Sequence, residues 1–233
     1  MSLINLSLLF ASTVAMNISV TPPTSPASSS ERVKVSWVDI ALTTGGVYLM
    51  KAVIFAPCLA AMAVVVATNY PSPYSSQILS TLLPNRWLQT PTVSRYLIAG
   101  VFASIIGAAG RVWCYRTLGR HFTYQLSILK GHRLLTSGPY AIVRHPSYTA
   151  AILVSSGLTL VHLAPGSFTQ SCGWLETILG KTLFSAWIFE VLLFILIALI
   201  RTKKEDNMLK GQFGIEWERY AKRVRYRLLP GIY

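Results

Sequence analysis

The chain has 233 residues, of which 52% are hydrophobic and only 12% are charged, and its mean hydropathy is +0.48. This balance excludes an ordinary soluble domain, because several apolar runs approach the roughly 20 residues that span a bilayer. A net charge of +13 would suit nucleic-acid binding in a soluble protein. In a membrane protein it indicates basic loops beside anionic lipid headgroups. We therefore predict an all-α, multi-span integral membrane bundle of about four to five transmembrane helices, with no nucleic-acid partner.

The N-terminal region, residues 1–30, combines an apolar segment over 3–20 with a linker over 21–30 that is rich in Pro and Ser. The apolar segment is short and has no basic residues before it. A weak first span, an interfacial segment and a cleaved signal peptide therefore all stay open. The composition of the linker predicts no packed structure.

Residues 31–120 are predicted to hold the N-terminal membrane spans, over 45–68 and 95–115, with a polar loop over 69–94 between them. The second of these spans is rich in small residues, which let helix backbones approach closely in lipid. Its small residues are Gly100, Ala103, Ser104, Gly107, Ala108, Ala109 and Gly110.

The third region, residues 121–233, consists of a polar loop, two more apolar runs and a C-terminal tail. The apolar runs are Ser147–Ala164 and Ile178–Ile200. The turn sequence PGSFTQSCGW joins them, so we expect a helical hairpin. Bases flank the hairpin at both of its ends, in 111–145 and in the tail from 201 onward. Basic residues favour the cytosolic side of a membrane, and both ends are therefore predicted to lie there.

Two further features of the sequence bear on the fold. The three cysteines, Cys58, Cys114 and Cys172, are far apart, which predicts free thiols and neither a metal site nor a disulfide. In the tail sequence FGIEWERYAKRV, four apolar residues fall on one stripe of a helix. An amphipathic C-terminal helix is therefore predicted, either at the membrane interface or against the protein's own loop. The stripe consists of Phe213, Trp217, Tyr220 and Val224.

The sequence SGPYAIVRHPSYTA, residues 137–150, places polar and helix-breaking residues at the start of an apolar run. Pro146 is suited to the first turn of a helix, where its missing N–H would be unpaired in any case. A helix beginning there would direct free backbone N–H groups toward the cytosol, and such an end attracts anions. Arg144 and His145 stand beside it, so we predict an anion-binding pocket at the membrane surface.

A second polar cluster, RTKKEDNML over 201–209, follows the last apolar run. In a helix Arg201 and Glu205 would share a face. The alternative interpretation is an ordinary ion pair between residues four apart at the end of a helix, with basic side chains that extend toward the membrane surface. Both polar clusters belong to the same membrane side of the predicted hairpin. They could form one site, with bases for an anion and Glu205 for a cation or for ribose hydroxyls.

The stretches HRLLTSGPYAIVRHPSYTA and RTKKEDNMLKGQFGIEWERYAKRVRYRLLP resemble the isoprenylcysteine carboxyl methyltransferase family. The resemblance covers roughly residues 121–230. It implies methyl transfer from S-adenosylmethionine to the C-terminal carboxylate of a farnesylated or geranylgeranylated cysteine in CaaX-processed proteins. It also implies a multi-pass protein of the endoplasmic reticulum membrane whose cofactor pocket faces the cytosol.

The resemblance also implies a set of site residues, with Arg201 holding the substrate and no metal. The implied cofactor contacts are Gln125, His132, Arg133, Leu134, Leu135, Tyr140, His145, Pro146, Ser147, Tyr148 and Glu205. No catalytic base is assigned, because a carboxylate is already ionised at neutral pH and a sulfonium is already a good leaving group. Catalysis would consist of positioning. Ala150 replaces a frequent glycine and Asp206 replaces a glutamate, which leaves close helix packing near 150 and any role of Asp206 open.

Two other functions remain in competition. A membrane methyltransferase could act on a phospholipid amine or another lipid, and such an acceptor would favour carboxylates near the methyl group, whereas a carboxylate acceptor favours Arg201. A membrane scaffold or channel without enzymatic activity is the second alternative.

Overall fold

The computed structural model describes residues 3–21, 23, 45–83, 92–122 and 133–233, and every regular element in this part of the chain is helical. The prediction of an all-α bundle is therefore confirmed. The long helices are α1 (Leu3–Val20), α3 (Gly45–Asn69), α5 (Arg95–Leu118), α6 (Pro146–Leu163) and α8 (Ile178–Phe213). The short ones are α4 (Ser75–Leu82), α7 (Phe168–Ser171), α9 (Ile215–Arg223), η1 (Gly119–His121), η2 (Gly138–Ala141) and η3 (Trp174–Glu176).

Within the described residues, 3 helical stretches are long and apolar enough to cross a membrane: Arg95–Leu118, Pro146–Ser171 and Ile178–Phe213. Two shorter apolar stretches, Ile4–Val20 and Phe55–Asn69, accompany them. They correspond to the first two runs that the sequence predicts. The chain is a multi-pass membrane protein, because no soluble fold would leave helices this apolar on its surface.

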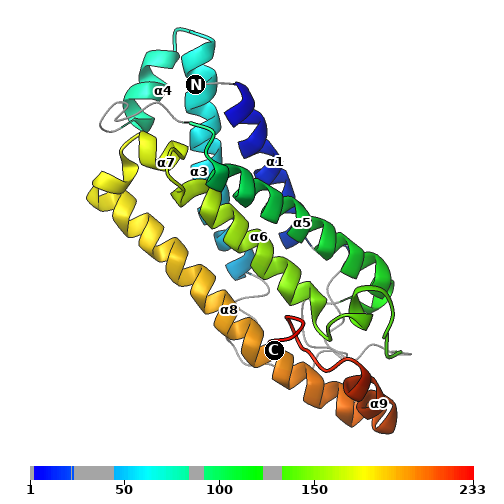
Figure 1. Cartoon of the computed structure of the whole chain (residues 1–233). Coiled ribbons are helices and arrows are strands. Elements are labelled where there is room, and N and C mark those ends of the chain that lie inside the picture. The colour runs from blue at the N-terminus through cyan, green and yellow to red at the C-terminus, as the bar shows by residue number, and fades with distance from the viewer. Residues whose placement is uncertain (1–2, 22, 24–44, 84–91, 123–132) are drawn as a thin grey trace.

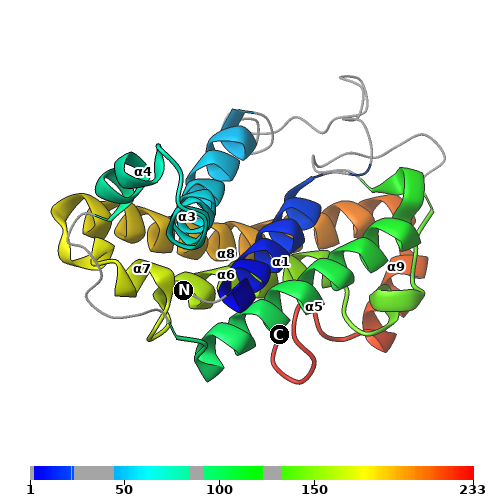
Figure 2. The same cartoon turned by 90° about the horizontal axis from the view of Figure 1, so that it is seen from above.

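Successive long helices run in opposite directions, and α6 lies between α5 and α8 in both views (Figures 1 and 2). α1 packs mainly against α5 and also contacts α3 and α6. This arrangement gathers the end of α5, the start of α6 and the polar end of α8 at one end of the bundle (Figure 1). It is the end that carries the basic segments and the C-terminal helix α9.

Close contact between α5 and α6 depends on glycine. A Cβ atom on Gly107 would lie 2.6 Å from Cγ2 of Val154 and 2.7 Å from the backbone oxygen of Ala150. A Cβ on Gly100 would lie 2.7 Å from the backbone oxygen of Gly157. The predicted role of the small residues in this span is therefore confirmed. The replacement at position 150 does not prevent close packing, because α5 provides glycine opposite Ala150.

Gly107→Ala is expected to destabilise the protein by about 1–3 kcal/mol, because the added methyl group meets backbone as well as side-chain atoms. The measurement is the melting temperature of the detergent-solubilised protein. Gly211→Ala is the matched control, since a Cβ there has nothing within 4 Å. Alanine is the better helix former by roughly 0.5–1 kcal/mol, so this control should melt no lower than the wild type. Equal melting of Gly107→Ala and wild type would contradict the packing argument.

The structure differs from the sequence-based expectation at three places. The loop predicted over 69–94 contains helix α4, and the turn after α6 contains α7 and η3. The last helix does not end with its apolar run at Ile200, because α8 continues to Phe213. No proline interrupts the polar stretch, and the helix ends only where Gly214 adopts a φ of 50°. The cluster over 201–209 is therefore helical.

The structure also bears on the predictions for the cysteines and the C-terminal helix. Cys58, Cys114 and Cys172 are buried free thiols. The predicted stripe does not lie on one helix, because Phe213 ends α8 and α9 begins only at Ile215. Its residues still face inward, since Tyr220 and Val224 are buried while Phe213 and Trp217 are half-buried. The hydroxyl of Tyr220 donates to the backbone oxygen of Tyr140 at 2.8 Å. The stripe thus packs against the protein's own loop.

Candidate active site

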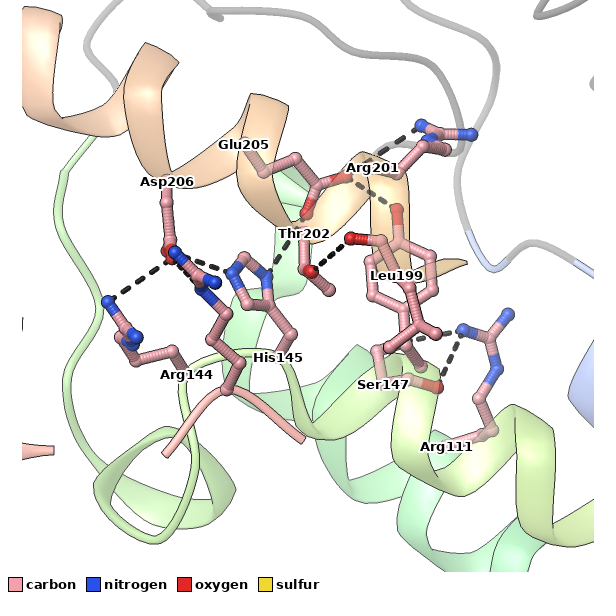
Figure 3. A network of polar contacts seen from close by, with 11 residues as sticks. Arg111, Arg144, His145, Ser147, Leu199, Arg201, Thr202, Glu205 and Asp206 are labelled. Carbon is pink, nitrogen blue, oxygen red and sulfur yellow. Dashed lines mark hydrogen bonds and ion pairs between the residues drawn. The ribbon is translucent and has the colours of Figure 1, made fainter. Parts of the chain in front are cut away.

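A polar network lies where the start of α6 meets the polar end of α8 and the C-terminal tail (Figure 3). α6 begins at Pro146 with His145 as its N-cap residue. The proline fixes its own backbone and keeps the preceding residue out of the helix. His145 therefore lies just before the helix, and its side chain points toward α8.

Asp206 is the most buried acid of this network, with 2% of its surface exposed. Its carboxylate accepts from Nε2 of His145 at 2.9 Å and from Nε of Arg227 at 2.8 Å, and it lies 3.2 Å from Nη1 of Arg144. One carboxylate therefore contacts three basic side chains. The ion pair with Asp206 in turn raises the pKa of Arg227.

His145 joins two neighbouring carboxylates of α8. Its Nε2 faces Asp206, and its Nδ1 lies 3.2 Å from Oε2 of Glu205. Burial of the ring opposes its charging, but the hydrogen bonds and charges of Asp206 and Glu205 prevail, and the pKa of His145 is raised from 6.5. When the ring is protonated, both nitrogens act as donors, and the imidazole then has no lone pair with which to accept a proton from a substrate.

Glu205 is more exposed than Asp206, since 21% of its side-chain surface is accessible against 3%. The hydroxyl of Tyr148 donates to Oε1 of Glu205 at 2.6 Å. Arg201, one turn earlier on α8, places Nη2 at 3.8 Å from the same oxygen. The predicted pairing of Arg201 and Glu205 on one helix face is therefore present, although its distance exceeds that of a hydrogen bond.

Arg111 connects the start of α6 to the end of α1. Its Nη1 donates to Oγ of Ser147, and its Nε and Nη2 donate to the backbone oxygen of Ser19 at 3.1 and 3.0 Å. The hydroxyl of Tyr115 donates to the same oxygen of Ser19 at 2.7 Å. A guanidinium and a tyrosine hydroxyl thus both donate to a carbonyl in the last turn of α1, where carbonyls have no partner within the helix.

The C-terminal tail changes the expected picture of the start of α6. Backbone N–H groups of Arg144 and His145 donate to the backbone oxygens of Tyr226 and Arg227 at 2.9 and 2.8 Å. The N–H of Tyr148 donates to the backbone oxygen of His145 at 3.2 Å. The prediction of free N–H groups at the helix start is therefore wrong for Tyr148, whereas the N–H groups that the tail occupies belong to the two residues before the helix. Basic side chains remain as the main feature that attracts anions.

The network unites the predicted residues His145, Ser147, Tyr148, Arg201 and Glu205. Pro146 is buried at the first position of α6, and Tyr140 is buried in η2. Leu134 and Leu135 are half-buried and Arg133 is exposed in the stretch before Ser137, and within the described chain none of these three belongs to the network. Gln125 and His132 lie outside the described residues.

Sequence reasoning missed three members of the network: Asp206, Arg227 and Arg111. The family resemblance drew attention to position 206, but the replacement of a glutamate by Asp206 left its role open. Arg227 lies in a stretch without helical periodicity, so no pattern marks it. Arg111 is a base inside an apolar span, and such residues commonly serve a function or a buried contact.

Comparison with known proteins bears on this network. Residues 98–169 match the model of the isoprenylcysteine carboxyl methyltransferase (ICMT) family. The predicted resemblance to the ICMT family is thereby confirmed. The matched range contains most of α5, the loop with His145 and all of α6. It ends before α8, so Arg201, Glu205 and Asp206 lie beyond it.

Individual relatives fall into two groups. Protein-S-isoprenylcysteine O-methyltransferase B of Arabidopsis thaliana is 31% identical over 127 residues, which cover 54% of this chain and 55% of that protein. Delta(14)-sterol reductase of Neurospora crassa is 31% identical over 131 residues, which cover 49% of this chain and 26% of that protein. A 7-dehydrocholesterol reductase of Arabidopsis thaliana is 30% identical over 100 residues, covering 43% and 19%. The chain thus spans about a quarter or less of these reductases and about half of the methyltransferase.

The raised pKa of His145 predicts a pH dependence of stability. A cation whose pKa is higher in the folded state contributes stability below its ordinary value of 6.5, and this contribution disappears as the pH rises through the folded-state value. Glu205, Asp206, Arg144 and Arg227 are the charged groups that face it. We therefore expect the melting temperature to fall as the pH rises above about 6.5. His145→Gln should melt with a flatter profile, and parallel profiles for the two proteins would contradict the assignment.

Proposed function

We propose that this protein is a protein-S-isoprenylcysteine O-methyltransferase. It would transfer a methyl group from S-adenosylmethionine to the C-terminal carboxylate of an isoprenylated cysteine in CaaX-processed proteins. The match of residues 98–169 to the ICMT family and the similarity to the Arabidopsis methyltransferase support this reaction class. Residues 121–233 form the proposed methyltransferase region.

The observation that carries the proposal is the charge balance of the network. Arg111, Arg144, Arg201 and Arg227 are cationic, whereas Glu205 and Asp206 are its two carboxylates. Both carboxylates already have cationic partners. The excess of positive charge favours an anionic acceptor, such as a carboxylate, over the amine of a phospholipid.

The residues also fit the proposed cofactor. The amino-acid end of S-adenosylmethionine carries one ammonium and one carboxylate group, and the network offers partners of both signs. Glu205 is its more accessible acid, and Arg144 has a buried Nε without a hydrogen-bond partner among the described residues. The proposed cofactor contacts are Tyr140, His145, Pro146, Ser147, Tyr148 and Glu205, together with Gln125, His132, Arg133, Leu134 and Leu135.

In this mechanism the protein acts by orientation. Bound S-adenosylmethionine would supply the methyl group from its sulfonium. Arg201 would hold the acceptor carboxylate and align one oxygen with that methyl group, and good alignment can contribute roughly 7–11 kcal/mol. No base is needed, and His145 could not provide one because both ring nitrogens face carboxylates. We propose that the site faces the cytosol at the endoplasmic reticulum membrane, where a prenyl tail can remain in lipid.

The similarity to Delta(14)-sterol reductase supports a second candidate, the reduction of a sterol double bond. That reaction would require a hydride donor in place of a methyl donor. The two proposals therefore differ in the cofactor as well as in the acceptor. The phospholipid amine remains a third possible acceptor.

The deciding experiment supplies membranes carrying this chain with methyl-labelled S-adenosylmethionine and one of three acceptors. These are farnesyl-cysteine, its C-terminal amide and phosphatidylethanolamine. A parallel incubation contains a reduced nicotinamide and a Δ14-sterol. The proposal expects a base-labile label on farnesyl-cysteine alone. Label in the phospholipid, or reduction of the sterol without methyl transfer, would reject it.

A further inference from the structure

The carboxylate of Asp206 is bound by three side chains of the protein itself. Its partners are Arg144 and His145 from the loop before α6 and Arg227 from the C-terminal tail. The carboxylate is almost fully buried. Its three partners take up three of the roughly four acceptor directions of a carboxylate, and almost none of its surface is accessible to a ligand. Any influence of Asp206 on a bound molecule must pass through its neighbours.

His145 is the neighbour that can transmit this influence. Asp206 holds Nε2 of the ring at 2.9 Å, which fixes the plane of the imidazole and directs Nδ1 toward Oε2 of Glu205. Glu205 is in turn held from the other side by the hydroxyl of Tyr148. The orientation of the accessible carboxylate of Glu205 thus depends on the buried one.

The C-terminal tail is part of the same arrangement. Backbone hydrogen bonds from Arg144 and His145 dock the tail at residues 226 and 227, and the hydroxyl of Thr149 donates to the backbone oxygen of Leu228 at 2.7 Å. The side chain of Arg227 then reaches Asp206. The tail therefore clamps the loop before α6 against α8, with Asp206 as the point where the three segments meet.

We propose that Asp206 is a positioning residue of the cofactor site, which holds His145 so that Glu205 keeps the orientation needed to bind S-adenosylmethionine. This inference rests on the proposed function. It assigns a role to a residue that the resemblance left open. It also gives the tail, through Arg227, an indirect part in cofactor binding.

The test is a double-mutant cycle on cofactor affinity, measured by calorimetry with S-adenosylmethionine on the full detergent-solubilised chain. Asp206→Asn is expected to weaken binding about tenfold, within the range for residues coupled in one hydrogen-bond network. In a His145→Gln background the same change should alter the affinity for S-adenosylmethionine by less than about twofold. The imidazole that connects residue 206 to Glu205 is already absent there. Asp206→Glu, which keeps the charge, should recover most of the affinity.

A pH profile separates positioning from a general loss of structure. Without Asp206 the imidazole loses one of its two carboxylate partners, so cofactor binding in Asp206→Asn should decline at a lower pH than in the wild type. Glu218→Gln is the matched control, because that acid pairs with an exposed lysine, Lys210, at 2.9 Å. It should change neither affinity nor the profile.

If Asp206→Asn does not fold, Asp206→Asn/Arg227→Gln keeps the net charge of the cluster and carries the same cycle, with Arg227→Gln as its reference. Unchanged affinity, or an equal loss with and without His145, would overturn the positioning role alone. Absence of S-adenosylmethionine binding by the wild type would overturn the proposed function, and this inference with it.

Discussion

Arg201→Ala is expected to lower kcat/KM for farnesyl-cysteine by about 100-fold, which corresponds to the loss of one charge-assisted hydrogen-bonded pair. Arg201 lies on the inner flank of α8, one turn before Glu205, and only 13% of its side chain is exposed. A guanidinium there can hold a carboxylate at two points, which fixes the direction of the attacking oxygen. The affinity for S-adenosylmethionine should change by less than about threefold, because Tyr148 and His145 still hold Glu205.

Two comparisons make this prediction specific. Arg201→Lys should recover only part of the activity, since an ammonium offers charge without the planar fork. Lys204→Ala removes a base from the exposed face of the same helix and should behave like the wild type. Inhibition by the product methyl ester, which has no carboxylate to clamp, should be the same for Arg201→Ala and wild type. Near-normal turnover of Arg201→Ala would exclude the proposed clamp.

Glu205→Gln is expected to weaken S-adenosylmethionine binding by about 10- to 100-fold, the range for a hydrogen bond to a charged group. Glutamine keeps the shape and can still accept from Tyr148, but it loses the negative charge that His145 and a cofactor ammonium would share. The measurement is calorimetric titration at a pH near neutrality. Glu205→Ala should bind S-adenosylmethionine more weakly still, because it also leaves the hydroxyl of Tyr148 without its acceptor.

The KM for the acceptor, farnesyl-cysteine, provides the internal control for Glu205→Gln. At saturating cofactor the KM for farnesyl-cysteine should remain within about threefold of wild type, since Arg201 still carries its charge. Glu205→Gln would thus weaken the donor and Arg201→Ala the acceptor. If both variants raised the same KM, Arg201 and Glu205 would be acting as one unit and the separate assignments would be wrong.

Much of the fold follows from local composition. Each apolar run became a helix because a span must satisfy its backbone hydrogen bonds within itself. The glycines of α5 marked the surface on which α6 packs. α4 escaped prediction because eight residues rich in Ser and Leu carry too short a pattern. The continuation of α8 to Phe213 depended on the absence of proline, since Gly211 is tolerated within the helix and the helix ends only at Gly214.

The candidate site was only partly predictable. His145, Tyr148, Arg201 and Glu205 stood out by motif or spacing, and the structure brings them together. Asp206 could not be placed in this way, because adjacent residues on a helix point about 100° apart. Which of the two acids faces the ligand depends on what packs against each side of α8.

The amino-acid sequence by itself determined that this chain forms apolar membrane helices, where each begins, and which end of the bundle collects the basic residues. These properties arise from interactions between residues close together along the chain. Tertiary structure decided that the tail docks beside the start of α6, that Arg227 and Arg144 share the carboxylate of Asp206, and that His145 bridges Asp206 and Glu205. These contacts join segments up to 82 residues apart, as from Arg144 to Tyr226, and only the packing of α6, α8 and the tail brings such charges within hydrogen-bonding distance.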